Sequence, residues 1–181
     1  HLSSGTFELI KPILADFGMD INLMKNCKPW FLAIQLENIV LLRLGFYPMA
    51  GIDIYFLQKA EGAKKVVELE SIEYQINLFN NLTDKEQEAL LLSTLGDIKV
   101  IEKEINRIVE MWKAGDIRGL ESILQKGVSG NPDTLSLYNK ILFERNKNMV
   151  AKIEGFLKDQ NTYFVVVGAA HLVGKKGIVE I

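Results

Sequence analysis

A long run of apolar residues spaced for one helix face is the feature that most constrains this chain. The run recurs at alternating steps of three and four residues, through Leu91, Leu95, Ile98, Ile101, Ile105, Ile108 and Trp112. Such spacing is typical of a helix that packs one face into a core. Thr83, with Glu86 three residues later, forms a capping-box pattern, and Gly115-Asp116 provides a stop. We therefore expect one long helix between these two signals.

Helical patterns also fill most of the remaining chain. Starts at Pro29 and at Asn131-Pro132, and stops at Gly18 and Gly45, bound several of them. The expected helices cover residues 6–18, 30–44, 54–60, 72–80 and 117–126, a last long one after 132, and a short one after 174. The segment 30–44 is apolar nearly all round, which indicates a buried helix. Trp30 and Trp112 are both expected to pack in the core.

Two short apolar runs predict strands. Lys65–Leu69 is short and β-branched, and Tyr163–Val167 is continuously apolar, as in a strand that is covered on both faces. The expected fold class is thus α/β and rich in helix. In it, a mostly parallel sheet of few strands is surrounded by long helices in a single domain over residues 1–181.

Composition narrows the classes of function. The 181 residues carry 21 basic and 23 acidic side chains, and this balance does not favour a nucleic-acid partner. Cys27 is the single cysteine, which excludes an internal disulfide and a cysteine zinc cluster. Charged residues and Pro48 interrupt the most apolar stretch, residues 30–57, so no membrane span is predicted. The N-terminus carries no signal-peptide pattern.

The ends of the two predicted strands are the places where we expect chemistry, because ligands of open α/β sheets bind at the carboxyl ends of strands. Gly168-Ala169-Ala170-His171 follows one strand, and Glu70 follows the other. Histidine is a common metal ligand and general base. The alternative is that His171 is a structural hydrogen-bonding residue, and one histidine alone does not hold a catalytic metal.

Arg145 and Asn146 interrupt the apolar stripe of the last long helix, between Leu142 and Met149. A buried arginine needs a carboxylate, and Glu70 and Asp53 are the two that we nominate. The alternative is that the stripe widens here and Arg145 reaches solvent. Gln75 follows Glu70 by five residues, and it is either a surface amide or a support for the Glu70 loop.

Several local patterns occur in a characteristic order along the chain. They are Lys28-Pro29-Trp30, Gly51-Ile52-Asp53, Leu69-Glu70 with Gln75, Trp112 with Gly115-Asp116, Arg145-Asn146, and the block GAAHLVGKKGIVE from Gly168. In this order they resemble the TraB/PrgY/GumN family, which includes the animal Tiki proteins. The resemblance extends from about Ser3 to Ile181, and the final block is its most specific part.

The resemblance implies a fold like that of erythromycin esterase and ChaN proteins. It also implies metal-dependent peptidase activity at a site with two Gly-x-x-His motifs and a glutamate. Gly168 and His171 match the second motif, so His171 would bind Zn, Mn or Co. Glu70 and Arg145 would then be catalytic, and Asp53, Gln75 and Asn146 would line the pocket. Export, a periplasmic location or a lipid or membrane anchor is implied for such proteins.

The first Gly-x-x-His motif and the last C-terminal strand that the resemblance implies have no counterpart in this chain. We therefore expect the chain to be truncated at both ends and to be inactive as a peptidase by itself. A second hypothesis is a non-catalytic module that binds a peptide, a small ligand or haem through His171. A third is a domain that works by assembly, with the apolar helix 30–44 as an interface between copies or with a partner.

Overall fold

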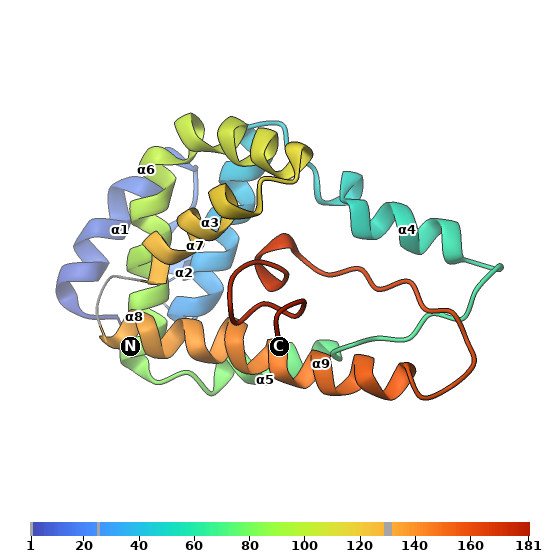
Figure 1. The fold of residues 1–181 in the computed structure, drawn as a ribbon. Helices are drawn as coiled ribbons and strands as arrows, with labels where there is room; N and C mark the ends of the chain where they lie inside the picture. Colours follow the sequence, from blue (N-terminus) through green and yellow to red (C-terminus); the bar gives the residue numbers. More distant parts are fainter. Residues whose placement is uncertain (1, 25, 129–131) are drawn as a thin grey trace.

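A bundle of helices makes up most of the molecule (Figure 1). The structure is a computed structural model and describes residues 2–24, 26–128 and 132–181. The α-helices are α1 (Ser4–Asp16), α2 (Ile21–Met24), α3 (Pro29–Arg43), α4 (Ile52–Ala60), α5 (Ile72–Asn80), α6 (Asp84–Ala114), α7 (Ile117–Val128), α8 (Pro132–Tyr138) and α9 (Arg145–Phe156). Two 3-10 turns, η1 (Pro48–Ala50) and η3 (Ala169–His171), and a π-helical segment, η2 (Asn139–Glu144), complete the list.

The prediction of a β-sheet is wrong, because the described residues contain no strand. Lys65–Leu69 and Tyr163–Val167, the two predicted strands, are irregular segments that pair with no neighbouring strand among the described residues. The side chains of Val66 and Phe164 are 54% and 72% exposed. β-branched and aromatic residues suit a pleated, half-buried surface, but a ladder forms only where a second strand is available. The fold is therefore α-helical over the part that the structure describes, and the α/β class does not hold.

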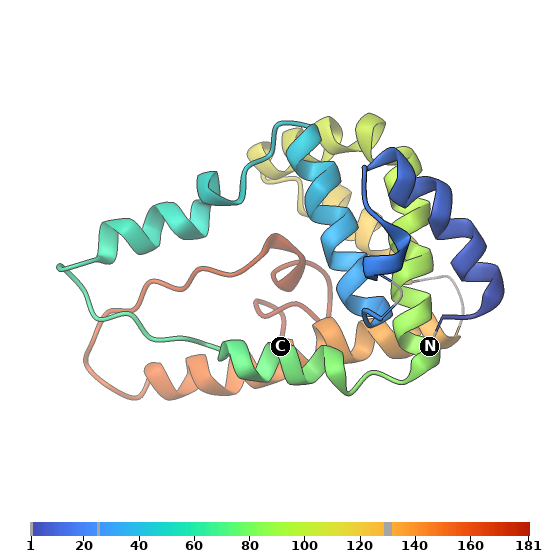
Figure 2. The ribbon, with the colours of Figure 1, turned by 180° about the vertical axis from the view of Figure 1, so that it is seen from behind.

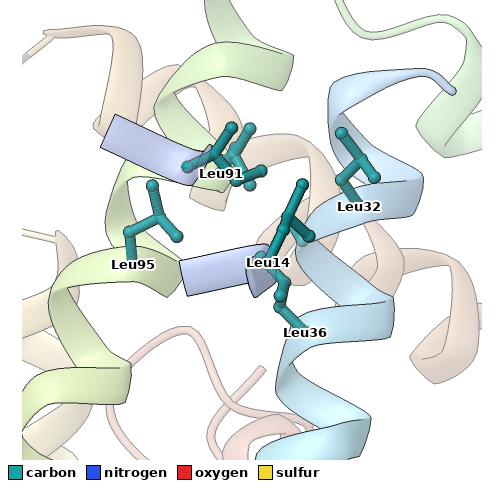
Figure 3. Close-up of a cluster of buried hydrophobic side chains, with 7 residues drawn as sticks. Leu14, Leu32, Leu36, Leu91 and Leu95 are labelled. Atoms are coloured by element: carbon teal, nitrogen blue, oxygen red, sulfur yellow. The ribbon is translucent and has the colours of Figure 1, made fainter. Parts of the chain in front are cut away.

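The long helix is confirmed as α6, and it packs along α3. The core lies where α1, α3 and α6 meet, and the five leucines labelled in Figure 3 point toward one another there. The core residues are Ile10, Leu14, Leu32, Ala33, Leu36, Leu91 and Leu95. In Figure 2 these three helices gather at one end of the molecule, and α4 projects at the other end. No helix in the described ranges has both the length and the apolarity to cross a membrane.

The burial of α3 and of Trp112 differs from the prediction. Helix α3 buries one face only, as the exposed fractions of Phe31 and Leu42, 39% and 43%, show. Trp112 is 50% exposed, since the last turn of α6 runs beyond the packed part of the seam and Met111 takes the inward position. Trp30 is half-buried and stacks on Phe79, with ring centroids 5.3 Å apart. The presence of apolar residues on a helix was therefore not enough to predict which of them face the core.

The capping box of α6 is confirmed and extends into a buried polar cluster. The Thr83 hydroxyl accepts from the Glu86 amide, and the Glu86 carboxylate accepts from the Thr83 amide. The same carboxylate accepts from Ser136 Oγ at 2.7 Å and from Lys140 Nζ at 2.8 Å, which joins the start of α6 to α8 and η2. Glu86 is 4% exposed. Burial raises its pKa, but the hydrogen bonds from Lys140, Ser136 and Thr83 outweigh burial and lower the pKa to about 2.

This cluster predicts a pH-dependent loss in the variant Glu86→Gln. Ionised Glu86 stabilises the fold above its ordinary pKa of 4.5, and this contribution is lost as the pH falls through about 2. At pH 7 we expect the variant to lose about 3 kcal/mol in free energy of unfolding, measured by urea denaturation. The deficit should shrink as the pH is lowered from 5 toward 2.

The matched control is Glu110→Gln, because Glu110 makes an exposed ion pair with Lys113. That variant should change the free energy of unfolding by less than about 0.5 kcal/mol. Equal losses in the two variants, or a deficit for Glu86→Gln that is independent of pH, would show that the cluster does not hold an ionised Glu86.

Candidate functional site

A nearly buried ion pair links the start of α9 to the segment before α5. Arg145 donates from Nε and Nη2 to the two carboxylate oxygens of Glu70, at distances of 2.6 to 3.1 Å. Its Nη1 donates to the backbone carbonyl of Ile141 at 3.0 Å. The side chains of Arg145 and Glu70 are 16% and 6% exposed. The prediction that Arg145 pairs with a carboxylate is confirmed with Glu70, and the solvent-directed alternative is wrong.

The local sequence explains why Glu70 is held at this point. Ser71 caps α5 by accepting from the Tyr74 amide, which fixes the turn directly after Glu70. Gln75, one turn into α5, donates from Nε2 to Glu70 Oε2 at 3.4 Å. Lys152 of α9 donates to the Glu68 carbonyl and holds the chain on the other side. Gln75 therefore contacts Glu70, as expected if it supports the loop that carries Glu70.

Asp53 is separate from this cluster. It lies in the first turn of α4 and is exposed, and its carboxylate folds back toward Gly51. Within the described ranges, no hydrogen bond or ion pair joins Asp53 to Arg145, and Glu70 fills that place. The nomination of Asp53 as a partner of Arg145 is therefore wrong, because α4 lies apart from α9, on the other side of the segment that contains residues 164–167 (Figure 1).

His171 makes a second contact with the same helix. Asn146 is 1% exposed, and its Nδ2 donates to the Lys176 carbonyl at 2.6 Å. Its Oδ1 lies 2.6 Å from His171 Nδ1. Because the amide nitrogen of Asn146 is used by Lys176, the amide oxygen faces the imidazole, and Nδ1 must carry the proton and donate it. The neutral ring then has its lone pair on Nε2, for which no described residue supplies a hydrogen bond.

The charge state of His171 follows from its surroundings. Burial lowers the pKa of this imidazole, the positive charge of Arg145 lowers it further, and the negative charge of Glu70 opposes both. The ring is half-buried. The imidazole is therefore neutral at pH 7, with Nε2 able to accept a proton or bind a cation.

Two glycines shape the coil that carries His171. Gly174 has φ +77°, in the left-handed region that favours glycine. A Cβ on Gly177 would lie 2.7 Å from the Leu172 carbonyl oxygen and 2.8 Å from that of Val173, so only glycine allows this approach. The tight coil replaces the short helix predicted after residue 174. Gly168 has an ordinary φ of −61°, and a Cβ there would meet His171 at 3.8 Å, so neither backbone nor space demands glycine at this position.

An apolar groove lies beside this coil, and the sequence reasoning missed it. Residues 164–167, with Phe56, Ile153, Leu172 and Ile178, line a volume of about 320 Å³. The run of valines was the signal, but we interpreted it as a strand inside a sheet and not as a wall open to a ligand. The C-terminal coil that carries His171 also forms part of the groove wall, through Leu172 and Ile178. Within this coil, the Ile178 amide donates to the His171 carbonyl at 2.8 Å.

Five of the seven predicted site residues thus meet through α9. Glu70, Gln75 and Arg145 form one cluster, and Asn146 and His171 form the next, while Gly168 starts the turn that leads to His171. Among the side chains that the structure describes, no group of three or more His, Cys, Asp or Glu residues is placed to share a metal ion.

Comparison with known proteins gives one match. A model of the TraB/PrgY/gumN family matches residues 1–181, the whole chain. No curated protein and no solved structure matches significantly.

The contact between Asn146 and His171 predicts how the imidazole titrates. Asn146→Asp places a carboxylate against Nδ1 and should raise the pKa of His171 by more than about 1 unit, because a neighbouring negative charge favours the imidazolium. The wild-type pKa should lie below the ordinary 6.5. Both values are measured from the imidazole proton shifts by NMR in a His1→Ala background, which leaves His171 as the single histidine.

Asn148→Asp is the matched control on the same helix, because Asn148 is exposed and contacts Tyr74. It should move the pKa of His171 by less than about 0.3 units, since solvent screens the added charge. Similar shifts in the two variants would show that Asn146 does not contact the ring.

Gly177→Ala should destabilise the protein by about 1–3 kcal/mol, because the added Cβ meets backbone carbonyls that do not yield easily. Gly155→Ala in α9 is the control: nothing lies within 4 Å of its Cβ position, and alanine favours a helix. Thermal melting compares the two. A melting temperature for Gly177→Ala that is equal to that of Gly155→Ala would contradict the observed coil.

Proposed function

The chain belongs to the TraB/PrgY/gumN family, and on this premise we propose that it supplies the second-histidine part of a hydrolytic site of the peptidase type. The reacting centre is then at His171. Glu70 and Arg145 order the centre and are not consumed in the reaction.

The observation that carries this proposal is the free lone pair of His171 Nε2. Asn146 holds the ring through Nδ1, and the Lys176 carbonyl holds Asn146 in turn. A histidine whose second nitrogen is fixed by a hydrogen bond is the usual arrangement for a metal ligand or a general base. The low pKa keeps Nε2 unprotonated at neutral pH. His171 can therefore accept a proton from water or from a substrate group at this point.

A complete metal centre does not fit the residues in hand. A catalytic Zn site usually takes about three protein ligands, and His171 Nε2 offers one. Glu70 is the acidic residue that the sequence predicted for this site, but both of its carboxylate oxygens accept hydrogen bonds from Arg145. Across the described ranges, no third ligand joins these two. That the chain is inactive as a peptidase by itself stays a prediction.

The second candidate function is binding without turnover, and the saturation of Glu70 favours it. The carboxylate accepts from Arg145 and Gln75, so it is not available to activate water. In this candidate, His171 Nε2 provides one polar contact to a ligand that lies in the apolar groove. In the first candidate His171 binds a metal ion or a proton, and in the second it contacts a bound ligand. A measurement of Zn²⁺ affinity separates the two.

Zinc affinity tests the leading proposal. The His1→Ala background removes the other imidazole of the chain, and Zn²⁺ binding is then compared by calorimetry with and without His171→Ala. We expect Zn²⁺ to bind at least about tenfold more weakly when His171 is replaced, because one imidazole ligand is lost. Lys175→Ala, next to the same turn, should leave the affinity within about twofold.

Equal affinity with and without His171 would overturn the metal-ligand role and leave the binding candidate. A further check is cleavage of a quenched peptide library in the presence of Zn²⁺, Mn²⁺ or Co²⁺. Robust turnover by this chain alone, lost in His171→Ala, would contradict the expected inactivity but would support the hydrolase.

A further inference from the structure

We propose that Lys176 is a positioning residue that selects the tautomer of His171, acting through the side-chain amide of Asn146. This role rests on the proposed function, which needs a free lone pair on Nε2 of the imidazole. It is supported by the donors and acceptors that join the three residues, by the packing of Lys176 on the ring of Phe143, and by the helix register that places Phe143 beside the C-terminal coil.

The contacts from Lys176 to His171 form a chain in which each partner fixes the next. The Lys176 carbonyl can only accept a hydrogen bond, and it accepts from Asn146 Nδ2 at 2.6 Å. Asn146 Oδ1 therefore lies 2.6 Å from His171 Nδ1 and accepts its proton. The position of the Lys176 carbonyl thus decides which ring nitrogen carries the proton.

The burial of Asn146 makes this dependence strong. The residue is 1% exposed, so water does not readily replace a partner that its amide loses. If the Lys176 carbonyl moved out of reach, Nδ2 would be a buried donor without an acceptor, which is rarer in proteins than an under-used oxygen. The amide would then turn over and donate to His171 Nδ1. The proton of the neutral ring would be on Nε2, and that nitrogen could no longer accept one.

The side chain of Lys176 holds the carbonyl in its place. Its Nζ lies over the ring of Phe143, 4.4 Å from the ring centroid. Phe143 and Asn146 are three positions apart and therefore neighbours on the helix surface, and they contact the ammonium and the carbonyl of the same residue. Lys175, next to it, is exposed and has no ring contact within the described ranges. The two adjacent lysines thus differ in the contact that matters for this role.

The π-helical segment η2 explains why Phe143 lies beside the coil. After Leu137, the next buried residues of this helix are Leu142, Asn146 and Met149, at steps of five, four and three residues. A regular helix keeps one face inward with steps of three or four, so the step of five marks one additional residue, which the π-helical turn absorbs. Segment η2 also contacts η3, the turn that carries His171. One helix therefore presents both Phe143 and Asn146 to the coil.

NMR of the neutral imidazole tests this role without any metal. In the His1→Ala background, His171 is the single histidine of the chain. The nitrogen chemical shifts of Nδ1 and Nε2 give the ratio of the two tautomers at about pH 8, where an imidazole is neutral. We expect the proton of the wild-type ring to be mainly on Nδ1.

Lys176→Met keeps the apolar stem and removes the ammonium. It should raise the ratio of the Nε2–H tautomer to the Nδ1–H tautomer about two- to fivefold, the change expected for loss of an exposed cation–π contact. Lys176→Arg keeps a cation over the ring and should leave the ratio within about 1.5-fold of the wild type. Lys175→Met, which removes the same charge one residue away, is the matched control and should also stay within about 1.5-fold.

Changes at Phe143 test the other side of the same contact. Phe143→Leu removes the ring without a change of charge and should shift the ratio as Lys176→Met does. Phe143→Tyr keeps a ring and should leave the ratio near that of the wild type. The double variant Phe143→Leu with Lys176→Met should shift the ratio no further than either single variant, because both changes remove one contact.

Equal ratios in Lys176→Met and Lys175→Met, additive shifts in the double variant, or a proton mainly on Nε2 in the wild type would each overturn the role of Lys176. The zinc measurement decides the proposed function separately. A tautomer ratio that follows Lys176, with zinc affinity independent of His171, refutes the proposed function alone. Zinc affinity that depends on His171, with a ratio that ignores Lys176, refutes the positioning role alone.

Discussion

The ion pair between Arg145 and Glu70 is the interaction on which the candidate site depends. It joins residues 75 positions apart, and it ties the irregular segment before α5 to the first turn of α9. Loss of one member of a buried pair costs on the order of 3–5 kcal/mol, because the other charge stays uncompensated. Burial is the main cause that lowers the pKa of His171, and the pair acts on it in two directions, because Arg145 lowers this pKa and Glu70 raises it.

Some parts of this arrangement could be predicted because they are local. The capping box at Thr83 and Glu86 and the seam of α6 involve residues three or four positions apart, and both are present. The partner of Arg145 is distant in sequence, but the need for it was predictable because a guanidinium on an apolar stripe demands a carboxylate. Which of Glu70 and Asp53 pairs with Arg145 could not be predicted from the sequence, since it depends on the direction in which α4 leaves the bundle.

The sheet could not be predicted correctly for a related reason. The valines of residues 65–69 and 163–167 have strand propensity, but propensity describes the fit of a side chain to a pleated surface and does not supply a neighbouring strand. Both segments run without a strand partner in the described part of the chain. The contact between Asn146 and His171 was likewise missed. It requires the tight turn at Gly174 and Gly177, and these residues were interpreted as the start of a helix.

The failed strand prediction and the candidate site share one physical origin. A run such as Tyr163–Val167 either pairs with a neighbouring strand or leaves its backbone groups to water, and here much of the run is exposed. Here α9 and the C-terminal coil fix the two sides of the run, through Ile153 and Leu172, without pairing its backbone. The polar side chains nearby are mostly satisfied, as Glu70 is by the Arg145 side chain and Asn146 is by the Lys176 backbone carbonyl. What this region leaves for a ligand is therefore an apolar groove, next to the free nitrogen of a single neutral imidazole.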